Sequence, residues 1–539
     1  MRESSIASRS WHAAVVLLAM FCAGLFAYWH IVDEVPPRWD EGGYLVAAMG
    51  EYRAAQTGGL IGFLHAYITT MPGGANFLPL LALPGFFLFG PSLKAGISIF
   101  FVLWPTVVLG MFDFTRKVAR HLFDLSEPLS SRAGFFAALA FSLYPETHFL
   151  ANYFLTEFPL ISCVVIVHAA ALRYALDGRF RWALITGLAL AFGLLTKTTF
   201  LAFLIAPAGF VLVRWITVRS PAEIGSCLAG AAIPPLLISA PFYVSNFSTI
   251  VDTVRRLTSA ETASTFGLGG AWTLGPSMDF IVALGRGYQF VLCCSAAALA
   301  VISTVNSKKK LGWALLIFLG FLIPLAIVAL SNFKQERYAY PGYIPLFALA
   351  GIGLSIVSRL PARFGWVVVA LIMWPAVEKL QATYPILPWR ALPQQALFIS
   401  GDEAPPPDSR DWGLTELVAS VDRYVPKGDV MILGGSPAFH QAVLQFIGAL
   451  QGKNDKYFGF LYQLYPDGRA ADMLAFIADR RPVAILYKAP PYNPPFLGKY
   501  VPEALHAIAT DSRYRSVELP TIQPDGSRFI LFAPNGKYN

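Results

Sequence analysis

Apolar runs recur along this chain between Trp11 and Leu380, and they constrain the fold more than any other feature. Many reach about 18 to 20 residues, the length that lets one helix cross the hydrocarbon core of a bilayer. The chain of 539 residues is also 55% hydrophobic and only 14% charged, and its mean hydropathy is +0.54. These values exclude an ordinary soluble globular protein and predict a polytopic α-helical membrane protein.

Basic residues predict the orientation of these helices, because short cytoplasmic loops carry an excess of Lys and Arg. The basic clusters lie at residues 116–120, 173–181, 214–219, 308–310 and 359–363. Each pair of successive clusters leaves room for one outward hairpin, which gives about eleven to thirteen transmembrane helices. The first apolar segment, at 11–30, is expected to be an uncleaved anchor with its amino terminus inside. The clusters themselves reflect topology and say little about substrate.

The residues after about 385 lose the pattern of long apolar runs. They alternate strand-like and helix-like pieces instead, such as DVMILGG at 429–435 and PVAILY at 482–487. The turn LGGSPAFH at 433–440 lacks the full glycine spacing of a phosphate-binding loop, which favours an ordinary strand-to-helix turn. We therefore predict a transmembrane domain over 1–385, a Pro-rich linker over 386–410 and an extracytoplasmic α/β domain over 411–539. Within the first domain, surface helices are expected at about 41–72 and an outer loop at about 245–285.

Ionisable residues at the ends of spans carry most of the functional information, because burying charge at membrane depth is expensive. The charge-derived topology places four polar groups of residues on the outer face. The first two lie in PPRWDEGGYL and in YPETHFLANYFLTEFPL, and they contain Asp40, Glu41, Glu146, His148, Asn152 and Glu157. The other two lie in GLLTKTTFLAF and in NFKQERYAYPGYIP, and they contain Lys197, Lys334, Glu336, Arg337 and Tyr338.

Each group also has an explanation that involves no function. Asp40 and Glu41 suit the first turn of a helix, where acidic side chains complement the helix dipole. Lys197 lies near the end of an apolar segment, where a lysine side chain can extend its ammonium group to the membrane interface. Arg337 is harder to explain in this way, because basic residues are usually less frequent on the outer side of the membrane. Carboxylates and cations on one membrane face suit a reaction in which a base takes a proton from a nucleophile while a departing phosphate needs positive charge.

The pieces DEGGYL, RWALITGLALAFGLLTKTTFLAFLI and ERYAYPGYIPLFALAGIGL resemble, in order and spacing, the polyprenyl-phosphate-dependent glycosyltransferases of the GT-C superfamily. This superfamily includes protein O-mannosyltransferases, aminoarabinose transferases of lipid A and galacturonic acid transferases of lipopolysaccharide core. The resemblance covers about residues 30 to 360 and implies a GT-C membrane domain. It also implies inverting transfer of a sugar from a lipid phosphate to an acceptor hydroxyl outside the cytoplasm.

The same resemblance implies roles for individual residues. Asp40 resembles the base that deprotonates the acceptor, with Glu41 as its companion. The lipid phosphate is expected to contact Arg337 and Tyr338, with help from Lys197 and Lys334, because an Arg fork supplies two donors to a phosphate. Acceptor or donor sugar contacts are assigned to Glu157, His148 and Asn152. Relatives often carry Asp where this chain has Glu157, which weakens the match at that position.

No cofactor is required by these residues, although His148 with Glu146 or Glu157 offers ligands for a divalent metal. The partners expected are a polyprenyl-phosphate-linked sugar donor, a lipid, glycan or protein acceptor, and membrane lipids, with no nucleic acid. The predicted location is a bacterial inner membrane, with the active site and the C-terminal domain on the periplasmic side. Two other classes stay open at this point: a lipid-carrier flippase or transporter, and a polysaccharide polymerase or ligase.

Overall fold

The structure is a computed structural model, and its contacts divide the chain into two compact units. The first unit, here called the bundle, comprises residues 1–31, 67–78 and 98–406, and the second comprises residues 32–66, 79–97 and 407–539. The residues described are 2–38, 40–71, 74, 76–257, 272–332, 334–359, 370, 374, 377–385, 406–433, 439–453, 458–460, 474–475, 477–479, 482–489 and 501–535.

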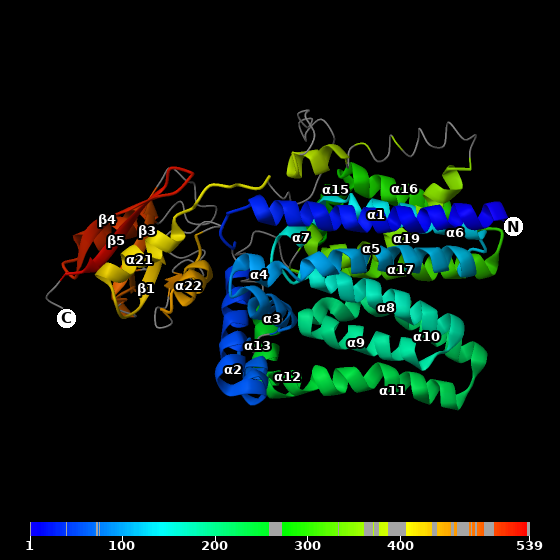
Figure 1. The fold of residues 1–539 in the computed structure, drawn as a ribbon, viewed down its shortest axis with the longest axis horizontal. Coiled ribbons are helices and arrows are strands. Elements are labelled where there is room, and N and C mark those ends of the chain that lie inside the picture. The colour runs from blue at the N-terminus through cyan, green and yellow to red at the C-terminus, as the bar shows by residue number, and fades with distance from the viewer. Residues whose placement is uncertain are drawn as a thin grey trace. The chain divides into compact units, whose positions relative to one another are not determined.

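Helices form the bundle, as its apolar runs predict (Figure 1). Its elements are α1 (Arg2–Val32), α5 (Phe100–Lys117), η1 (Val118–Leu122), α6 (Glu127–Ser142), α7 (Pro145–Asn152), α8 (Glu157–Asp177), α9 (Phe180–Thr196), η2 (Thr198–Leu204), α10 (Ile205–Val218), α11 (Pro221–Ile238), α12 (Ala240–Ser245), α13 (Phe247–Leu257), α15 (Leu274–Gly285), α16 (Tyr288–Ile302), α17 (Lys308–Leu330), α18 (Glu336–Ala339), η3 (Tyr340–Tyr343) and α19 (Ile344–Val357).

Among the described residues, 7 helices are long and apolar enough to cross a membrane, or up to 8 if the bent pair of α15 and α16 is one span. The predicted count of about eleven to thirteen stays a prediction. Small residues bring the long helices together, as is usual where lipid supplies no hydrophobic drive. A Cβ added to Gly187 of α9 would meet the backbone carbonyl of Gly230 on α11, so this helix pair depends on glycine.

A helix in the second unit occupies most of the stretch at about 41–72, and its place at a membrane surface stays a prediction. This helix, α2 (Asp40–Thr69), is broken at Gly59, whose backbone has φ 57° and ψ −144°. Two shorter helices accompany it, α3 (Phe77–Phe89) and α4 (Leu93–Ile97). The Asp33 carboxylate accepts the backbone N–H of Asp408 at 2.8 Å, which ties residues before α2 to the C-terminal part of the chain. The boundary predicted at residue 385 stays a prediction, but the contacts group 32–66 and 79–97 with the residues after 406.

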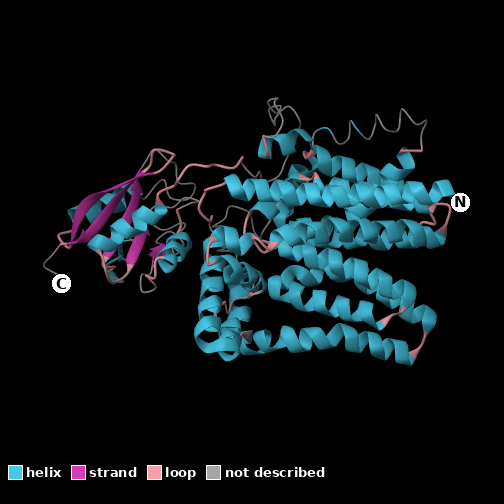
Figure 2. Cartoon of the chain, in the orientation of Figure 1, coloured by secondary structure: helices cyan, strands magenta, loops and turns pink. Residues whose placement is uncertain are grey.

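The C-terminal residues form a five-stranded sheet in the order β2-β1-β3-β5-β4, with β2, β1 and β3 parallel and β5 antiparallel to both of its neighbours (Figure 2). The predicted strands at 429–435 and 482–487 are β1 and β3. The elements are α21 (Leu414–Tyr424), β1 (Val430–Leu433), α22 (Gln441–Leu450), β2 (Phe458–Phe460), β3 (Ala484–Ala489), α24 (Val501–Thr510), β4 (Tyr514–Ile522) and β5 (Arg528–Pro534).

Side chains of β1 pack in apolar cores on both faces of this sheet, because successive side chains of a strand point to opposite sides. Val430 and Ile432 pack in one apolar cluster with side chains of α21 and α22, and Met431 and Leu433 pack in another with side chains of α24. Residues 434–438 of the turn at 433–440, residues 386–405 of the linker and residues 258–271 of the outer loop lie outside the described residues.

Candidate active site

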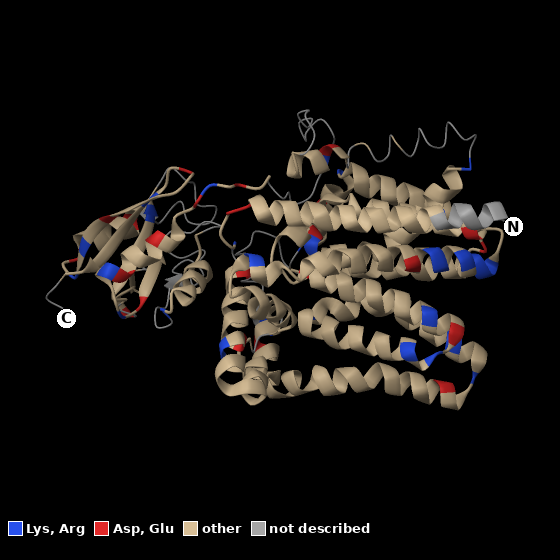
Figure 3. Cartoon of the chain, viewed as in Figure 1, with Lys and Arg blue, Asp and Glu red and all other residues tan. Residues whose placement is uncertain are grey.

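Charged residues in the bundle gather near the ends of its long helices, and the middle portions of these helices are largely uncharged (Figure 3). One of these groups joins residues that lie far apart in the sequence. Glu157 is the first residue of α8, and Lys197 lies at the break between α9 and η2. The Nζ of Lys197 lies 2.7 Å from Oε1 of Glu157.

This ion pair is largely withdrawn from solvent, with 4% of the Glu157 side chain and 25% of the Lys197 side chain exposed. The position of Glu157 at a helix start adds the favourable field of the helix dipole. In a buried pair, removal of one partner leaves an uncompensated charge, which costs about 3–5 kcal/mol. Glu157 therefore fixes the position of the Lys197 ammonium.

Two cations lie over one aromatic ring beside this pair. The Lys197 ammonium is 4.1 Å from the centroid of the Tyr338 ring, and the Arg337 guanidinium is 4.8 Å from the same centroid. Arg337 also donates to the Tyr338 hydroxyl at 2.8 Å and to the side-chain oxygen of Gln335 at 2.8 Å. We call Glu157, Lys197, Arg337 and Tyr338 the cation cluster. It contains two cations and one carboxylate, and an aromatic face helps to hold both cations.

The neighbouring predicted residue Lys334 has a different partner. Its side chain is buried, and its Nζ donates to the backbone carbonyl of Ser331 at 2.6 Å. Glu336 accepts a hydrogen bond from the Tyr144 hydroxyl at 2.7 Å. These two contacts help to fix the segment that carries Arg337. A lipid-phosphate contact for Lys334 stays a prediction.

His148 and Asn152, expected at a sugar site, meet a residue that the sequence did not single out. His148 Nδ1 lies 3.1 Å from the Tyr384 hydroxyl, and Asn152 Nδ2 donates to that hydroxyl at 2.9 Å. The other ring nitrogen of His148 lies 2.7 Å from the Ser142 carbonyl oxygen. All three side chains are buried, so this set of contacts joins α7 to the segment at residue 384. A sugar contact for His148 and Asn152 stays a prediction.

Asp40 and Glu41 lie in the first turn of α2, in the second unit. The two neighbours differ in their surroundings. Glu41 is buried, and its Oε2 accepts the backbone N–H of Arg38 at 2.7 Å, so it stabilises the helix start. Asp40 is exposed. The helix-start explanation therefore holds for Glu41, while the Asp40 carboxylate reaches solvent.

A third carboxylate on α2, Glu51, was missed by the sequence reasoning. Its side chain is buried, and neither of its oxygens has a hydrogen-bond partner among the described residues. Burial raises the pKa of Glu51 to about 8, so the neutral acid is favoured at neutral pH. The residues three and four positions before and after Glu51 are all alanine, and this apolar helix face is the sequence signal for its burial. They are Ala47, Ala48, Ala54 and Ala55.

Helix α2 is also held by the C-terminal part of its own unit. A Cβ on Gly42 would lie 2.6 Å from the backbone nitrogen of Val443 in α22, so the two helices approach closely there. Further along α2, Arg53 donates to the carbonyl of Ala449 at 2.6 Å. The helix that carries Asp40 is thus attached at two points to α22. Within the described residues, no group of three or more His, Cys, Asp or Glu side chains stands close enough to hold a metal ion.

Comparisons with known proteins agree with this architecture. Residues 96–239 match the family model described as dolichyl-phosphate-mannose-protein mannosyltransferase. The ArnT structure from Cupriavidus metallidurans bound to undecaprenyl phosphate is 13% identical, covers 97% of this chain and 98% of its own, and has a TM-score of 0.52. Residues 96–239 are thus similar to this family, and the chain as a whole has the fold of this glycosyltransferase structure.

Two other solved structures have the same fold. ArnT from Cupriavidus metallidurans in the apo state is 15% identical over 97% of this chain and 98% of its own, with a TM-score of 0.53. The Archaeoglobus fulgidus oligosaccharyltransferase tethered with an acceptor peptide is 12% identical over 89% of this chain and 69% of its own, with a TM-score of 0.52. No curated protein sequence matches the chain significantly. The chain therefore has a fold found in these glycosyltransferases, and its long apolar helices are those of a multi-pass membrane protein.

Proposed function

We propose that this chain is a GT-C glycosyltransferase that moves a sugar from a polyprenyl-phosphate donor to an acceptor hydroxyl, with inversion at the sugar carbon. The observation that carries the proposal is the cation cluster, because two cations held at one place suit a phosphate. The undecaprenyl phosphate bound to the similarly folded ArnT supports a donor of this class. The acceptors that fit the proposal are lipid A, a cell-envelope glycan or a protein.

The leaving phosphate is assigned to Arg337 and Lys197. When the bond between the sugar carbon and the phosphate oxygen breaks, negative charge grows on the phosphate, and preorganised cations stabilise it most at that moment. Arg337 offers a planar fork of donors, and Lys197 offers a compact ammonium. The Tyr338 ring and the Glu157 carboxylate hold these two groups in place before the donor arrives.

The proton of the acceptor is assigned to Asp40. As the acceptor oxygen forms its bond to the sugar carbon, its proton passes to the Asp40 carboxylate, whose exposed position leaves it accessible to an acceptor. Glu41 contributes by anchoring the first turn of α2 through the Arg38 N–H. No metal enters this sequence of events.

The site is proposed to work at the extracytoplasmic face, in a bacterial inner membrane. The support is the distribution of basic loops, which assigns residues 116–120 and 173–181 to the cytoplasm. These residues include the C-terminal ends of α5 and α8, whereas Glu157 is at the N-terminal end of α8. The cation cluster then lies on the outer side.

The proposal is tested by Asp40→Asn in purified full-length protein, given a defined polyprenyl-phosphate sugar and an acceptor extract in detergent. Loss of a general base lowers the rate by about 10²- to 10⁴-fold, so transfer is expected to fall by that amount. Glu34→Gln is the control, because Glu34 is an exposed acid of the same unit whose carboxylate forms an ion pair with Lys94 at 2.7 Å. Its activity is expected to match the wild type.

The same assay separates the enzyme from the other two classes. A flippase or transporter moves its lipid between leaflets and leaves the donor chemically intact, so it gives no product in detergent. A polymerase or ligase of the kind that relies on loop arginines keeps its activity in Asp40→Asn. Wild-type rates in that variant would therefore rule out Asp40 as the base.

A further inference from the structure

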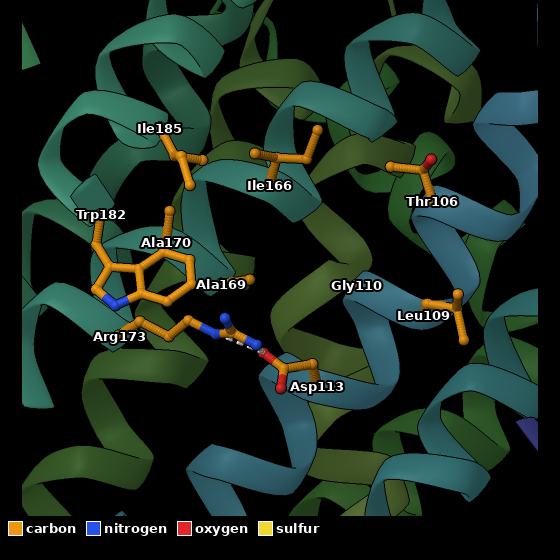
Figure 4. A pocket seen from close by; sticks show the side chains of 10 residues that line it. All are labelled: Thr106, Leu109, Gly110, Asp113, Ile166, Ala169, Ala170, Arg173, Trp182 and Ile185. Atoms are coloured by element: carbon orange, nitrogen blue, oxygen red, sulfur yellow. Dashed lines mark hydrogen bonds and ion pairs between the residues drawn. The ribbon is translucent and has the colours of Figure 1, made fainter. Parts of the chain in front are cut away.

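A groove lies in the bundle at the end of α8 far from the cation cluster, and nothing in the proposed transfer uses it. Its volume is about 370 Å³. Three helices supply its walls (Figure 4). They are α5 with Thr106, Leu109, Gly110 and Asp113, α8 with Ile166, Ala169, Ala170 and Arg173, and α9 with Trp182 and Ile185. Glu157 and Arg173 lie sixteen residues apart on α8, about 24 Å along a helix, so the groove and the cluster are separate places.

Most of the groove is apolar. Its one hydroxyl, on Thr106, donates to the Val102 carbonyl of its own helix at 3.0 Å, so it needs no polar ligand. Leu109 at the rim is 38% exposed on the surface of the described helices. In a spanning helix that surface faces lipid. This part of the groove therefore suits a hydrocarbon chain.

One end of the groove is charged. Arg173 binds Asp113 through Nη2 at 2.8 Å and lies 4.3 Å from the centroid of the Trp182 ring. In Figure 4 this ion pair and the indole stand together at that end, with the apolar side chains beyond them. Trp182 also donates to Asp177 at 3.0 Å. An indole beside a guanidinium is typical of the level at which lipid headgroups meet the hydrocarbon.

The ion network at this end keeps an excess of positive charge. Asp113 contacts three cations, and Glu127 contacts two, so four cations share two carboxylates: Arg116, Lys117, Arg120 and Arg173. The Arg173 side chain is 29% exposed. A half-buried guanidinium that still reaches solvent, in a network with surplus cations, attracts an anionic group, and basic pockets between helices on the cytoplasmic side bind anionic headgroups.

We propose that this groove binds one anionic phospholipid, with an acyl chain against the apolar wall and the phosphate at Arg173. The ligand must be amphiphilic, because the groove is apolar over most of its length and cationic at one end. A phospholipid is favoured over the polyprenyl phosphate, since the carrier's phosphate is needed at the cation cluster about 24 Å away along α8.

The test measures lipid retention by native mass spectrometry of the purified full-length protein. Phosphatidylglycerol and phosphatidylcholine with identical chains are supplied at equal concentration in detergent. The wild type is expected to retain about tenfold more phosphatidylglycerol than phosphatidylcholine. Arg173→Gln removes the headgroup cation and is expected to lose most of that preference, while Lys117 still balances Asp113.

A second variant tests the apolar wall without touching a charge. Ala169→Phe fills the groove and is expected to lower phosphatidylglycerol retention about tenfold. Ala229→Phe is its matched control, because Ala229 lies exposed on α11, outside the groove, and its retention should equal the wild type.

Equal retention in Ala169→Phe and Ala229→Phe would overturn the proposal, as would equal retention of both phospholipids by the wild type. Preferential retention of undecaprenyl phosphate over phosphatidylglycerol, lost in Ala169→Phe, would also overturn it in favour of a second carrier site. The readout is binding, so it does not depend on whether the transfer reaction proposed above is correct.

Discussion

The cation cluster of the bundle and the acidic helix α2 of the second unit hold their charges in opposite ways. In the cluster, Lys197 and Glu157 form a close ion pair, and Arg337 is fixed by Gln335 and Tyr338. On α2, Asp40 is exposed, and Glu51 is buried with no hydrogen-bond partner among the described residues. The cluster therefore holds its charges in ion pairs and hydrogen bonds, and α2 carries carboxyl groups that differ in exposure.

This contrast matches two tasks in the proposed reaction. A group that neutralises a leaving phosphate works best when it is already in place, because no reorganisation is then needed in the transition state. A base must instead be reachable by the acceptor and must be able to change its protonation state. The two regions divide these tasks, and the predictions that follow test that division.

Within the cation cluster, the largest effect is expected from the Lys197 pair. Lys197→Met removes a charge that is proposed to stabilise the leaving phosphate, so kcat/KM should fall by about 10²- to 10³-fold. The variant also leaves Glu157 buried without its partner, which lowers stability. The double variant Lys197→Met with Glu157→Gln should recover the thermal unfolding midpoint but not the activity. Recovery of both would mean that Lys197 serves only to balance Glu157.

A pH effect is expected from Glu51. Burial raises its pKa from the ordinary 4.5 to about 8, so between these values the folded chain holds a proton that the unfolded chain has lost. The free energy of unfolding should therefore fall as the pH rises through this window. Glu51→Gln removes the acid while keeping its shape, and its midpoint at pH 9 should exceed that of the wild type by several degrees.

The measurement is thermal unfolding of both proteins at pH 5 and pH 9. At pH 5 the Glu51 carboxyl is neutral in the folded chain, and the two midpoints should nearly coincide. If Glu51→Gln had the same unfolding midpoint as the wild type at both pH 5 and pH 9, Glu51 would not be the buried acid of α2. Glu34→Gln provides the comparison with an exposed acid, for which no such difference is expected.

The smallest effect is expected where α2 meets α22. Gly42→Ala places a Cβ 2.6 Å from the Val443 nitrogen, so one of the two helices must shift. Gly43→Ala is matched to it, because a Cβ there meets nothing within 4 Å. We expect kcat to fall a few-fold in Gly42→Ala with little change in the donor KM, and no loss in Gly43→Ala. Equal rates in the two variants would show that the contact with α22 does not position Asp40.

Patterns that repeat along the sequence predicted much of this architecture. Apolar runs predict the spanning helices, alternation predicts β1 and β3, and the first turn of α2 begins at Asp40 as the acidic pair indicates. The association of Lys197 with Glu157 was not predictable, because forty residues separate them and only packing of α8 beside α9 joins them. The role of Tyr384 as the partner of His148 and Asn152 was hidden for the same reason.

The division of tasks is tested most directly by binding of undecaprenyl phosphate to purified Asp40→Asn and Arg337→Gln, beside transfer assays of both. Asp40→Asn should bind the lipid phosphate as tightly as the wild type and yet transfer sugar about 10²- to 10⁴-fold more slowly. Arg337→Gln should bind at least about tenfold more weakly, since it loses a charged bidentate donor. Weakened binding in Asp40→Asn together with wild-type binding in Arg337→Gln would contradict the account.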